Sequence, residues 1–354
     1  MAGDQLALPA APARAAGAGA ADRPVRGRAP ESRAGVLRRR VAAALVIAPP
    51  VLLGAYAGGA WFVLGTVLIT FLALREFYSL SARPGARLLQ PLGFLLAFVV
   101  LLGNGGRDLL IGSMPAPAPA LAWPAALPGA LALGAWLRPD RFAYLARFSV
   151  AAAVIVPLVA LLFERVDLKG RLVGWALTLA GTLYVAWLMS HFQTLRLVGD
   201  PGSEAGRGWV FYTLAATWCF DSGAYLVGSR LGRRRFMTWI SPNKSWEGAA
   251  GGFALCLLAT LVARSDPPLL GPALAAWLGW APLPIALWHA PLLALALALA
   301  AQFGDLAESM IKREAGAKDA SELIPGHGGM LDRIDSLLFT VVLVYYYAVA
   351  VALA

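Results

Sequence analysis

The chain has 354 residues, of which 59% are hydrophobic and only 14% are charged. Soluble globular proteins carry roughly 25% charged residues. The low charged fraction, together with a mean hydropathy of +0.67, therefore indicates a membrane protein. Long apolar runs with 24 prolines and 37 glycines exclude a single-anchor enzyme, a coiled coil and an outer-membrane barrel. We therefore predict an all-α polytopic membrane protein, a helical bundle of about nine transmembrane spans with a disordered N-terminal tail.

Residues 1–40 form the predicted tail. They contain eight arginines against Asp4, Asp22 and Glu31, and they show no apolar periodicity. Such a segment cannot bury enough surface to fold, so we expect a disordered basic tail. Part of the net charge of +10 lies here, next to a membrane span, where basic charge sets orientation. We expect a lipid bilayer as the partner of this charge and no nucleic acid.

The apolar segments follow in order. A spanning helix needs roughly 20 apolar residues, and residues 41–74 are long enough for two spans that turn near residues 57–59. The further candidate spans are residues 88–104, 120–137, 144–163, 172–189, 209–228, 248–263, 285–304 and 337–354.

The distribution of basic residues decides between ten spans and nine. Ten spans would place the basic segment 230–244 outside, against the positive-inside rule. Residues 120–137 contain Pro124 and Pro128, and without this span the tail and both later basic loops lie in the cytoplasm. We predict nine spans, with residues 120–137 outside or at the interface and the C-terminus outside. Three regions result: the tail 1–40, transmembrane helices 41–208, and a transmembrane region 209–354 with cytoplasmic polar loops.

Lysine is rare in this chain. Of the 30 basic residues only four are lysines, and Lys244, Lys312 and Lys318 lie in two polar segments. A lysine offers phosphate oxygens a compact point charge. We interpret the clustering as a phosphate site, with chance as the competing explanation.

The first polar segment begins at Asp221, inside the apolar run 209–228. An aspartate at mid-span costs roughly 2.5–3.5 kcal/mol, so it normally faces a polar cavity, a partner charge or a metal. A pair with Arg230 or contact with headgroup water is the alternative. The run 241–248 then resembles a helix entry, in which Pro242 fits the first turn and Ser245 can cap the helix.

The second segment contains Asp305, Glu308 and Lys312, which share one face if the helix of residues 285–304 continues. The alternative is a solvated Glu308–Lys312 pair. Glycines flank His327, and Asp332 and Asp335 lie one helical turn apart. Carboxylates for a hard cation, basic groups for phosphate and glycine for close approach are all present. His327 is either a base or a donor to phosphate or backbone.

Residues 309–335 read Ser-x-x-Lys-Arg, Lys-Asp, Pro-Gly-His-Gly-Gly and Asp-Arg-Ile-Asp. This run resembles the signature of the phosphatidate cytidylyltransferase (CDP-diacylglycerol synthase) family. Residues 221–225, 241–248 and 304–309 are similar to upstream elements of that family. The resemblance covers roughly residues 209–340, and further upstream only the Arg-Glu-Phe-Tyr run at 75–78 is similar.

The resemblance implies transfer of a cytidylyl group from CTP to phosphatidic acid, with Mg²⁺, at the cytoplasmic face of the inner membrane. It implies Asp221 and Asp305 as metal ligands, and a catalytic set of Asp221, Asp305, Lys312, Asp332 and Asp335. The implied substrate-binding residues are Ser241, Lys244, Ser309, Arg313, Lys318, His327, Gly328, Gly329 and Arg333. A second cation and a homodimer are left open.

Three other functions compete with this one. A transporter or channel explains intramembrane carboxylates, but not the glycine-flanked histidine or the clustered lysines. A related enzyme that uses CTP on another lipid, such as a polyprenol or phytol kinase or an archaeal-lipid cytidylyltransferase, shares the chemistry. A structural membrane protein with headgroup-anchoring loops is the third.

Overall fold

The computed structural model describes residues 48–82, 88–111, 139–163, 169–199, 205–265, 282–323 and 328–352. Within these ranges the regular structure is helical, apart from an isolated β-bridge between Arg235 and Ser245. The all-α prediction is therefore confirmed for the described residues. The helices are a short segment Ala48–Ala57, α2 (Gly59–Ser81), α3 (Gln90–Ile111), α5 (Pro139–Leu162), α6 (Arg171–Gly181), the π-helix η2 (Thr182–Trp187), α7 (Leu188–Arg196), α8 (Ala205–Leu231), α9 (Trp246–Ala263), α11 (His289–Glu314) and α12 (Leu331–Ala352).

Six helical segments are long and apolar enough to cross a membrane. They are Gly59–Ser81, Tyr144–Leu162, Arg171–Arg196, Trp246–Ala263, His289–Glu314 and Leu331–Val351. The apolar helices Ala48–Ala57 and Gln90–Gly106 are shorter, and α8 is long but carries charged residues. A helix thus occurs at each predicted span within the described ranges. The predicted tail and residues 120–137 lie outside those ranges, so the count of nine spans stays a prediction.

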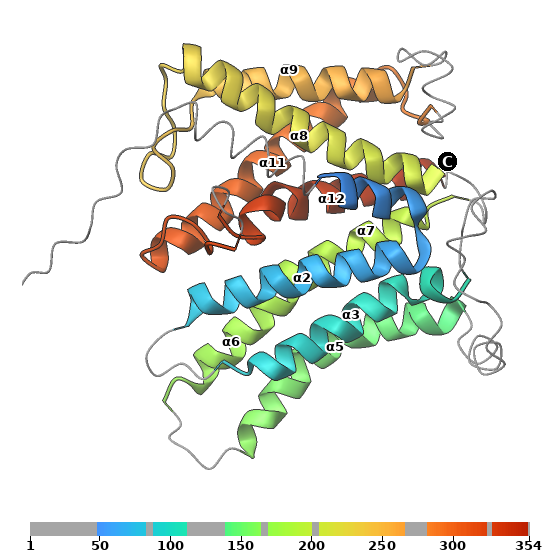
Figure 1. Cartoon of the computed structure of the whole chain (residues 1–354), viewed down its shortest axis with the longest axis vertical. Helices are drawn as coiled ribbons and strands as arrows, with labels where there is room; N and C mark the ends of the chain where they lie inside the picture. Colours follow the sequence, from blue (N-terminus) through green and yellow to red (C-terminus); the bar gives the residue numbers. More distant parts are fainter. Residues whose placement is uncertain are drawn as a thin grey trace, which may run out of the picture.

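Successive helices alternate in direction (Figure 1). The C-terminal ends of α2, α8 and α11 and the N-terminal ends of α9 and α12 therefore lie at one end of the bundle, here called the polar end. The C-terminal end of α12 lies at the other end. The basic loop 232–245 and the segment 315–323 both belong to the polar end, as the orientation prediction requires.

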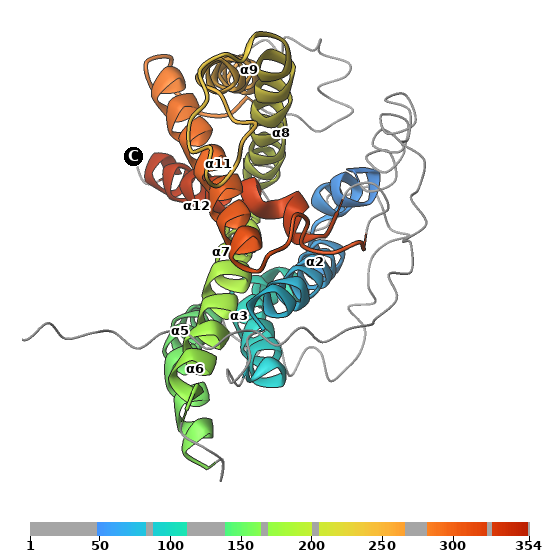
Figure 2. The same cartoon turned by 90° about the vertical axis from the view of Figure 1, so that its left-hand side faces the viewer.

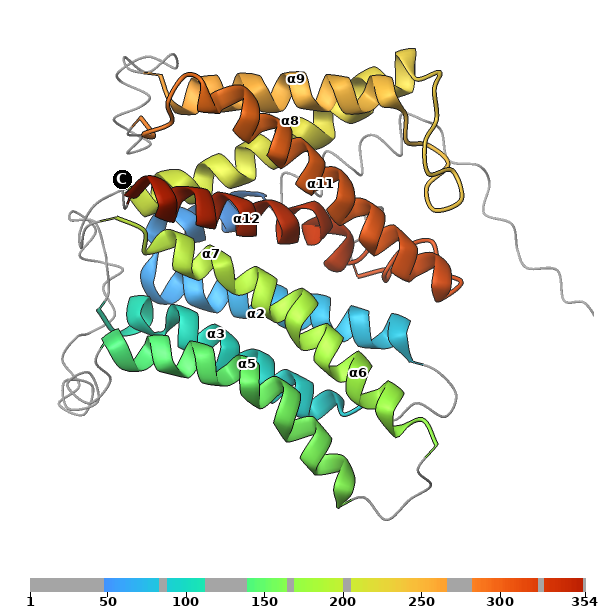
Figure 3. The same cartoon turned by 180° about the vertical axis from the view of Figure 1, so that it is seen from behind.

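The helices stack in a fixed order, visible from the front and from behind (Figures 1 and 3). The pair α8 and α9 lies at one side, α3 and α5 lie at the other, and α2, α7, α11 and α12 lie between them. α3 and α5 are antiparallel, because Gly103 packs on Ala146 while Leu96 packs near Ala152. Central α12 buries Leu331, Leu338, Val341 and Val344, while lipid-side positions of the outer helices are apolar and exposed.

α8 and α9 meet along a seam of glycines. A Cβ atom added at Gly223 would lie 2.5 Å from the carbonyl oxygen of Gly251, and one added at Gly252 would lie 2.7 Å from the ring of Phe220. Small residues let helix backbones touch, which is how transmembrane helices commonly associate. The close packing of the two helices therefore fixes the position of their connecting loop 232–245 at the polar end.

Candidate active site

Polar side chains of α2, α8, α11 and α12 converge at the polar end. This end of the bundle faces the viewer in Figure 2. The crossing of α11 and α12 explains part of this convergence. A Cβ atom added at Gly304 would lie 2.5 Å from the Asp335 carbonyl oxygen and 3.1 Å from the Cα of Ser336. Because Gly304 lets the two backbones approach this closely, the adjacent Asp305 and the facing Asp335 come to the same place.

The first group of side chains, the open cluster, consists of Asp221, Asp305, Asp335 and Lys244. The ammonium of Lys244 lies 2.7 Å from Asp305 Oδ2, and these two side chains are 13% and 40% exposed. Asp221 of α8 is exposed and interacts electrostatically with Asp305 and Lys244. Asp335 in turn feels the charges of Asp305 and Asp221. Three carboxylates thus face one ammonium, a surplus of negative charge that favours a bound cation.

Two serines hold the open cluster in place. Ser309 Oγ donates to Asp305 Oδ1 over 3.2 Å, one helical turn along α11. Ser336 Oγ donates to Asp221 Oδ1 over 3.5 Å and so links α12 to α8. Ser309 was predicted as a substrate-binding residue, and here it orients a carboxylate.

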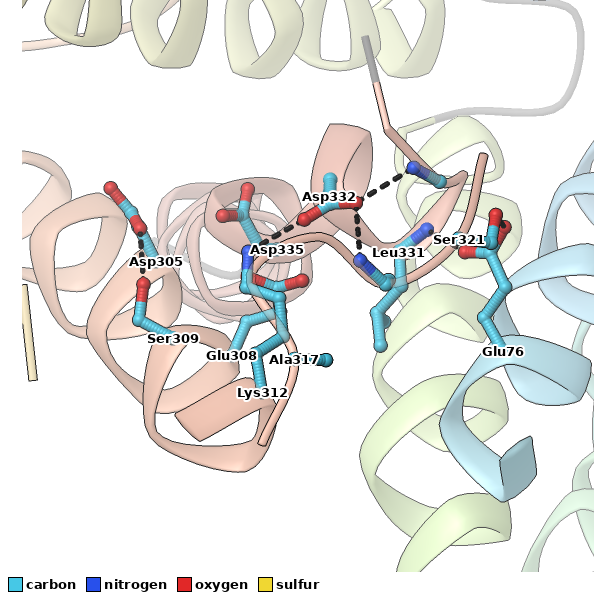
Figure 4. Close-up of polar contacts among 12 residues, drawn as sticks. Glu76, Asp305, Glu308, Ser309, Lys312, Ala317, Ser321, Leu331, Asp332 and Asp335 are labelled. Atoms are coloured by element: carbon cyan, nitrogen blue, oxygen red, sulfur yellow. Dashed lines mark hydrogen bonds and ion pairs between the residues drawn. The ribbon is translucent and has the colours of Figure 1, made fainter. Parts of the chain in front are cut away.

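The second group, the closed cluster, consists of Glu308, Lys312 and Asp332 (Figure 4). The Lys312 ammonium contacts the Glu308 carboxylate and lies 2.6 Å from Asp332 Oδ1. The three side chains are 11% (Lys312), 0% (Glu308) and 6% (Asp332) exposed. Asp332 Oδ2 also accepts from the N–H of Ala320 at 2.8 Å and of Gly329 at 2.7 Å. The closed cluster therefore fastens the two chain segments around residues 320 and 329 to α11 and α12.

Lys312 was grouped with Asp305 and Glu308 on one helix face, and α11 does continue through all three residues. The alternative of a solvated Glu308–Lys312 pair is wrong, because both side chains are buried. The ion pairs do not all form within this helix face, however. Asp305 pairs with Lys244 from the neighbouring loop, whereas Glu308 pairs with Lys312.

The loop 232–245 confirms one prediction and corrects another. Ser245 is the N-cap of α9, since its Oγ accepts from the N–H of Gly248 at 3.1 Å. Pro242 does not stand in the first helical turn: α9 begins at Trp246, and Pro242 lies in the turn before it. The reason is local, because the loop folds back through its bridge of Arg235 to Ser245 before the helix starts.

The other predicted substrate-binding residues lie around these clusters. Arg313 is exposed and donates to the carbonyls of Ile240 and Ala317, which ties α11 to the loop beside Ser241. Lys318 and Arg333 are exposed, and Arg333 interacts electrostatically with Asp221. Gly328 has a φ of +78° and packs against Asp332. His327 lies outside the described residues.

Sequence reasoning missed one buried carboxylate. Glu76 of α2 accepts hydrogen bonds from Ser321 Oγ at 2.6 Å, Met330 N at 3.0 Å and Leu331 N at 2.7 Å. The signal was available, because Glu76 is an acidic residue inside an apolar helix, the criterion that singled out Asp221. Ser336 was given no role either, although it directly follows the Asp-Arg-Ile-Asp run.

The donor chemistry of the open cluster suits a hard cation such as Mg²⁺, which prefers carboxylate oxygens. Within the described ranges no three Asp, Glu, His or Cys side chains are placed to hold a metal by themselves. Protein sites commonly hold Mg²⁺ with one or two carboxylates together with substrate phosphates. The predicted pair Asp221 and Asp305 therefore fits this ion when phosphate oxygens complete the coordination.

The described residues thus form a helical protein with six helices long and apolar enough to cross a membrane, and carboxylates, lysines and glycines gather at its polar end. The cytidylyltransferase family model matches residues 38–351, and the chain belongs to this family. Similar curated proteins are the phosphatidate cytidylyltransferases of Bacillus subtilis (strain 168), 36% identical over 170 residues, and Brucella suis biovar 1 (strain 1330), 36% identical over 174 residues. The matches cover 48% and 49% of this chain and 56% and 57% of those relatives.

A third relative, the phosphatidate cytidylyltransferase of Haemophilus influenzae, is 40% identical over 141 residues, which cover 39% of this chain and 44% of the relative. The chain thus spans about half the length of the curated relatives it matches. The family resemblance predicted from the motifs is confirmed.

Proposed function

We propose that this protein transfers the cytidylyl group of CTP to phosphatidic acid and forms CDP-diacylglycerol and pyrophosphate, a step of phospholipid synthesis. The relatives named above carry the name of this activity. The observation that carries the proposal is the open cluster. Three carboxylates and Lys244 from separate elements meet where apolar helices end, beside a basic loop.

In the proposed reaction, an oxygen of the lipid phosphate attacks the α-phosphorus of CTP. A new phosphorus–oxygen bond forms, the bond between the α-phosphorus and the bridging oxygen breaks, and pyrophosphate leaves with that oxygen. The second pKa of a phosphate monoester is near 6, so the attacking group is already largely dianionic at neutral pH. The chain therefore needs no general base.

The barrier is then mainly electrostatic, since a dianion must approach a triphosphate. Lys244 and Arg333 at the rim of the open cluster offset the phosphate charges. Asp221 and Asp305 would supply oxygen ligands for Mg²⁺ together with phosphate oxygens of the substrate, and Asp335 adds negative charge beside them. When bound, Mg²⁺ neutralises charge on the phosphates and on the departing pyrophosphate. Lys312 and Asp332 hold the chain segments around residues 320 and 329 in place.

The two substrates differ in solubility, and the position of the site suits both. The open cluster lies at the ends of helices that are apolar along most of their length. We place this end at the cytoplasmic face of the inner membrane, where CTP arrives from water. The lipid phosphate then lies at headgroup depth while its acyl chains stay in the bilayer.

The test is pyrophosphate release by the purified full-length protein with CTP, phosphatidic acid and Mg²⁺, together with recovery of labelled CDP-diacylglycerol. We expect turnover only with this pair, and none with ATP, with diacylglycerol or after chelation of Mg²⁺. Asp305→Asn should lower turnover strongly, whereas Glu322→Gln, which changes an exposed carboxylate outside both clusters, should not. Label in a polyprenyl or archaeal-type lipid phosphate, with none in phosphatidic acid, would assign the chemistry to another lipid.

The absence of a base predicts an order between two variants. His327→Ala should lower turnover less than Asp305→Ala, because phosphatidic acid needs no proton removed while the open cluster loses a ligand. Turnover of the two variants at saturating Mg²⁺ measures this. An equal or larger loss with His327→Ala would favour a base mechanism instead.

A further inference from the structure

We infer that Glu76 is a positioning residue of the active site, which holds residues 329–331 in the arrangement that the closed cluster requires. This inference rests on the proposed function. It extends the site to α2, a helix of the N-terminal half that the catalytic motifs do not include. Glu76 touches no reacting group and acts through the chain segment that it holds.

The contacts of Glu76 all point to one place (Figure 4). Its Oε1 accepts from Ser321 Oγ and Met330 N, and its Oε2 accepts from Leu331 N. The side chain is buried. The N–H groups at the start of a helix have no partner within the helix, and a negative charge is favourable there. Glu76 therefore caps α12 from a position 255 residues away in the sequence.

A second carboxylate holds the same segment from the other side. Gly329 N donates to Asp332 Oδ2 at 2.7 Å, while the next two N–H groups go to Glu76. Gly329 also packs directly on the Glu76 carboxylate, so that any side chain at this position would collide with it. Three consecutive backbone N–H groups, of residues 329, 330 and 331, are thus divided between the two acids.

Asp332 connects this arrangement to the closed cluster. The oxygen that does not hold Gly329 lies 2.6 Å from the Lys312 ammonium. A shift of residues 329–331 would therefore move Asp332 and, with it, Lys312. A buried carboxylate in an apolar helix is costly to keep, and holding this segment gives Glu76 a reason to be there.

The test compares Glu76→Gln with Thr70→Val in the full-length protein purified in detergent. Glutamine keeps the shape of glutamate but has one acceptor oxygen, so it cannot serve all three donors. Thr70 is also buried in α2, yet its hydroxyl bonds within its own helix, to Thr66 O at 2.7 Å. Hydrogen–deuterium exchange of residues 328–333, kcat and KM for CTP, and the thermal midpoint are measured for each.

We expect Glu76→Gln to speed exchange at Met330 and Leu331 and to lower kcat, each on the order of 10-fold, the size of effect seen when outer-shell partners of a site are lost. KM for CTP should stay within about 3-fold, since losing a group that binds no substrate spares ground-state binding. Thr70→Val should leave all three readouts at wild-type values. Ser321→Ala removes one donor and leaves the carboxylate, so it should give a smaller increase in exchange. If Glu76→Gln does not fold, Ser321→Ala takes its place in the test.

Wild-type exchange and kcat in Glu76→Gln, or wild-type exchange in Ser321→Ala when Glu76→Gln does not fold, would overturn the inference. So would equal losses in Thr70→Val, which would mean general destabilisation of α2. If the wild-type protein does not transfer cytidylyl groups to phosphatidic acid, the proposed function fails. The exchange measurement still decides whether Glu76 holds the segment.

Discussion

The open and closed clusters are built from the same groups, carboxylates and a lysine ammonium, and they lie one helical turn apart on α11. Lys244 and Asp305 meet at the surface of the site, whereas Lys312, Glu308 and Asp332 are enclosed by protein. The two clusters therefore differ in access to water and not in chemistry.

Exposure decides what each cluster can do. The Lys244–Asp305 pair is partly exposed, since the side chain of Asp305 is 40% exposed and that of Lys244 is 13% exposed. Water screens such a pair, so we expect a phosphate or a cation to replace one partner at a lower cost than in a buried pair. A buried pair is costly to break, because the remaining charge is left without a partner. If the proposed function is right, we expect the open cluster to exchange its partners during the reaction while the closed cluster remains intact.

Lys312→Met gives the largest expected effect. It leaves Glu308 and Asp332 facing each other without a cation, and losing one partner of a buried ion pair costs about 3–5 kcal/mol. We expect a clearly lower thermal midpoint in detergent and no turnover. A variant that retains the wild-type midpoint would show that the closed cluster does not stabilise the fold.

Asp305→Asn should separate activity from stability. Removing one ligand and one charge from the open cluster should lower kcat about 10²- to 10³-fold, the scale of losing one electrostatic contact to a transition state. Asp305 is partly exposed and its loss also relieves repulsion with Asp221 and Asp335, so stability should change by no more than about 1 kcal/mol. Steady-state kinetics and thermal unfolding of the same preparation test both statements.

Lys244→Met should act in the same direction as Asp305→Asn but more weakly. A hydrogen bond to a charged group contributes about 1.5–3 kcal/mol, which corresponds to about a 10- to 100-fold loss of kcat/KM for CTP. The thermal midpoint should stay near that of the wild type, unlike that of Lys312→Met. If the two lysine variants lost stability equally, the distinction between the clusters would be wrong.

Ser309→Ala gives the smallest effect. Its hydroxyl orients Asp305 from within α11 over the long distance of 3.2 Å, so its loss should displace the carboxylate slightly and not remove it. We expect a loss of only a few-fold in kcat, with unchanged stability. Titration of activity with Mg²⁺ should show whether the loss arises from weaker metal binding.

Much of this arrangement was predictable from the sequence, because hydrophobic runs of about 20 residues specify membrane helices directly. Asp221 was identified because a charge inside an apolar run is costly, and Asp305 because it shares a predicted helix face with Glu308 and Lys312. The division into two clusters was not predictable. It depends on how α11 and α12 cross at Gly304, and on where the loop between α8 and α9 places Lys244 beside Asp305.

Glu76 shows a second limit of prediction from the sequence. Its helix and its polarity are evident from the sequence, but its partners lie about 250 residues away, and no periodicity connects them. Packing between distant helices decides such contacts. In the same way, Pro242 was assigned to a helical turn by a local preference, which the fold of the loop 232–245 overrides.

The glycine seam between α8 and α9 leads us to expect that the proposed activity can be abolished without altering a single charge. An alanine at Gly223 or Gly252 would push α9 outward, because each added methyl would collide with backbone or ring atoms of the opposite helix. Lys244 lies in the loop that connects those helices, so this displacement would move it away from Asp305. A saturation-mutagenesis map of the gene should therefore show positions along the glycine seam that tolerate no substitution. A search for reactive side chains alone would overlook them.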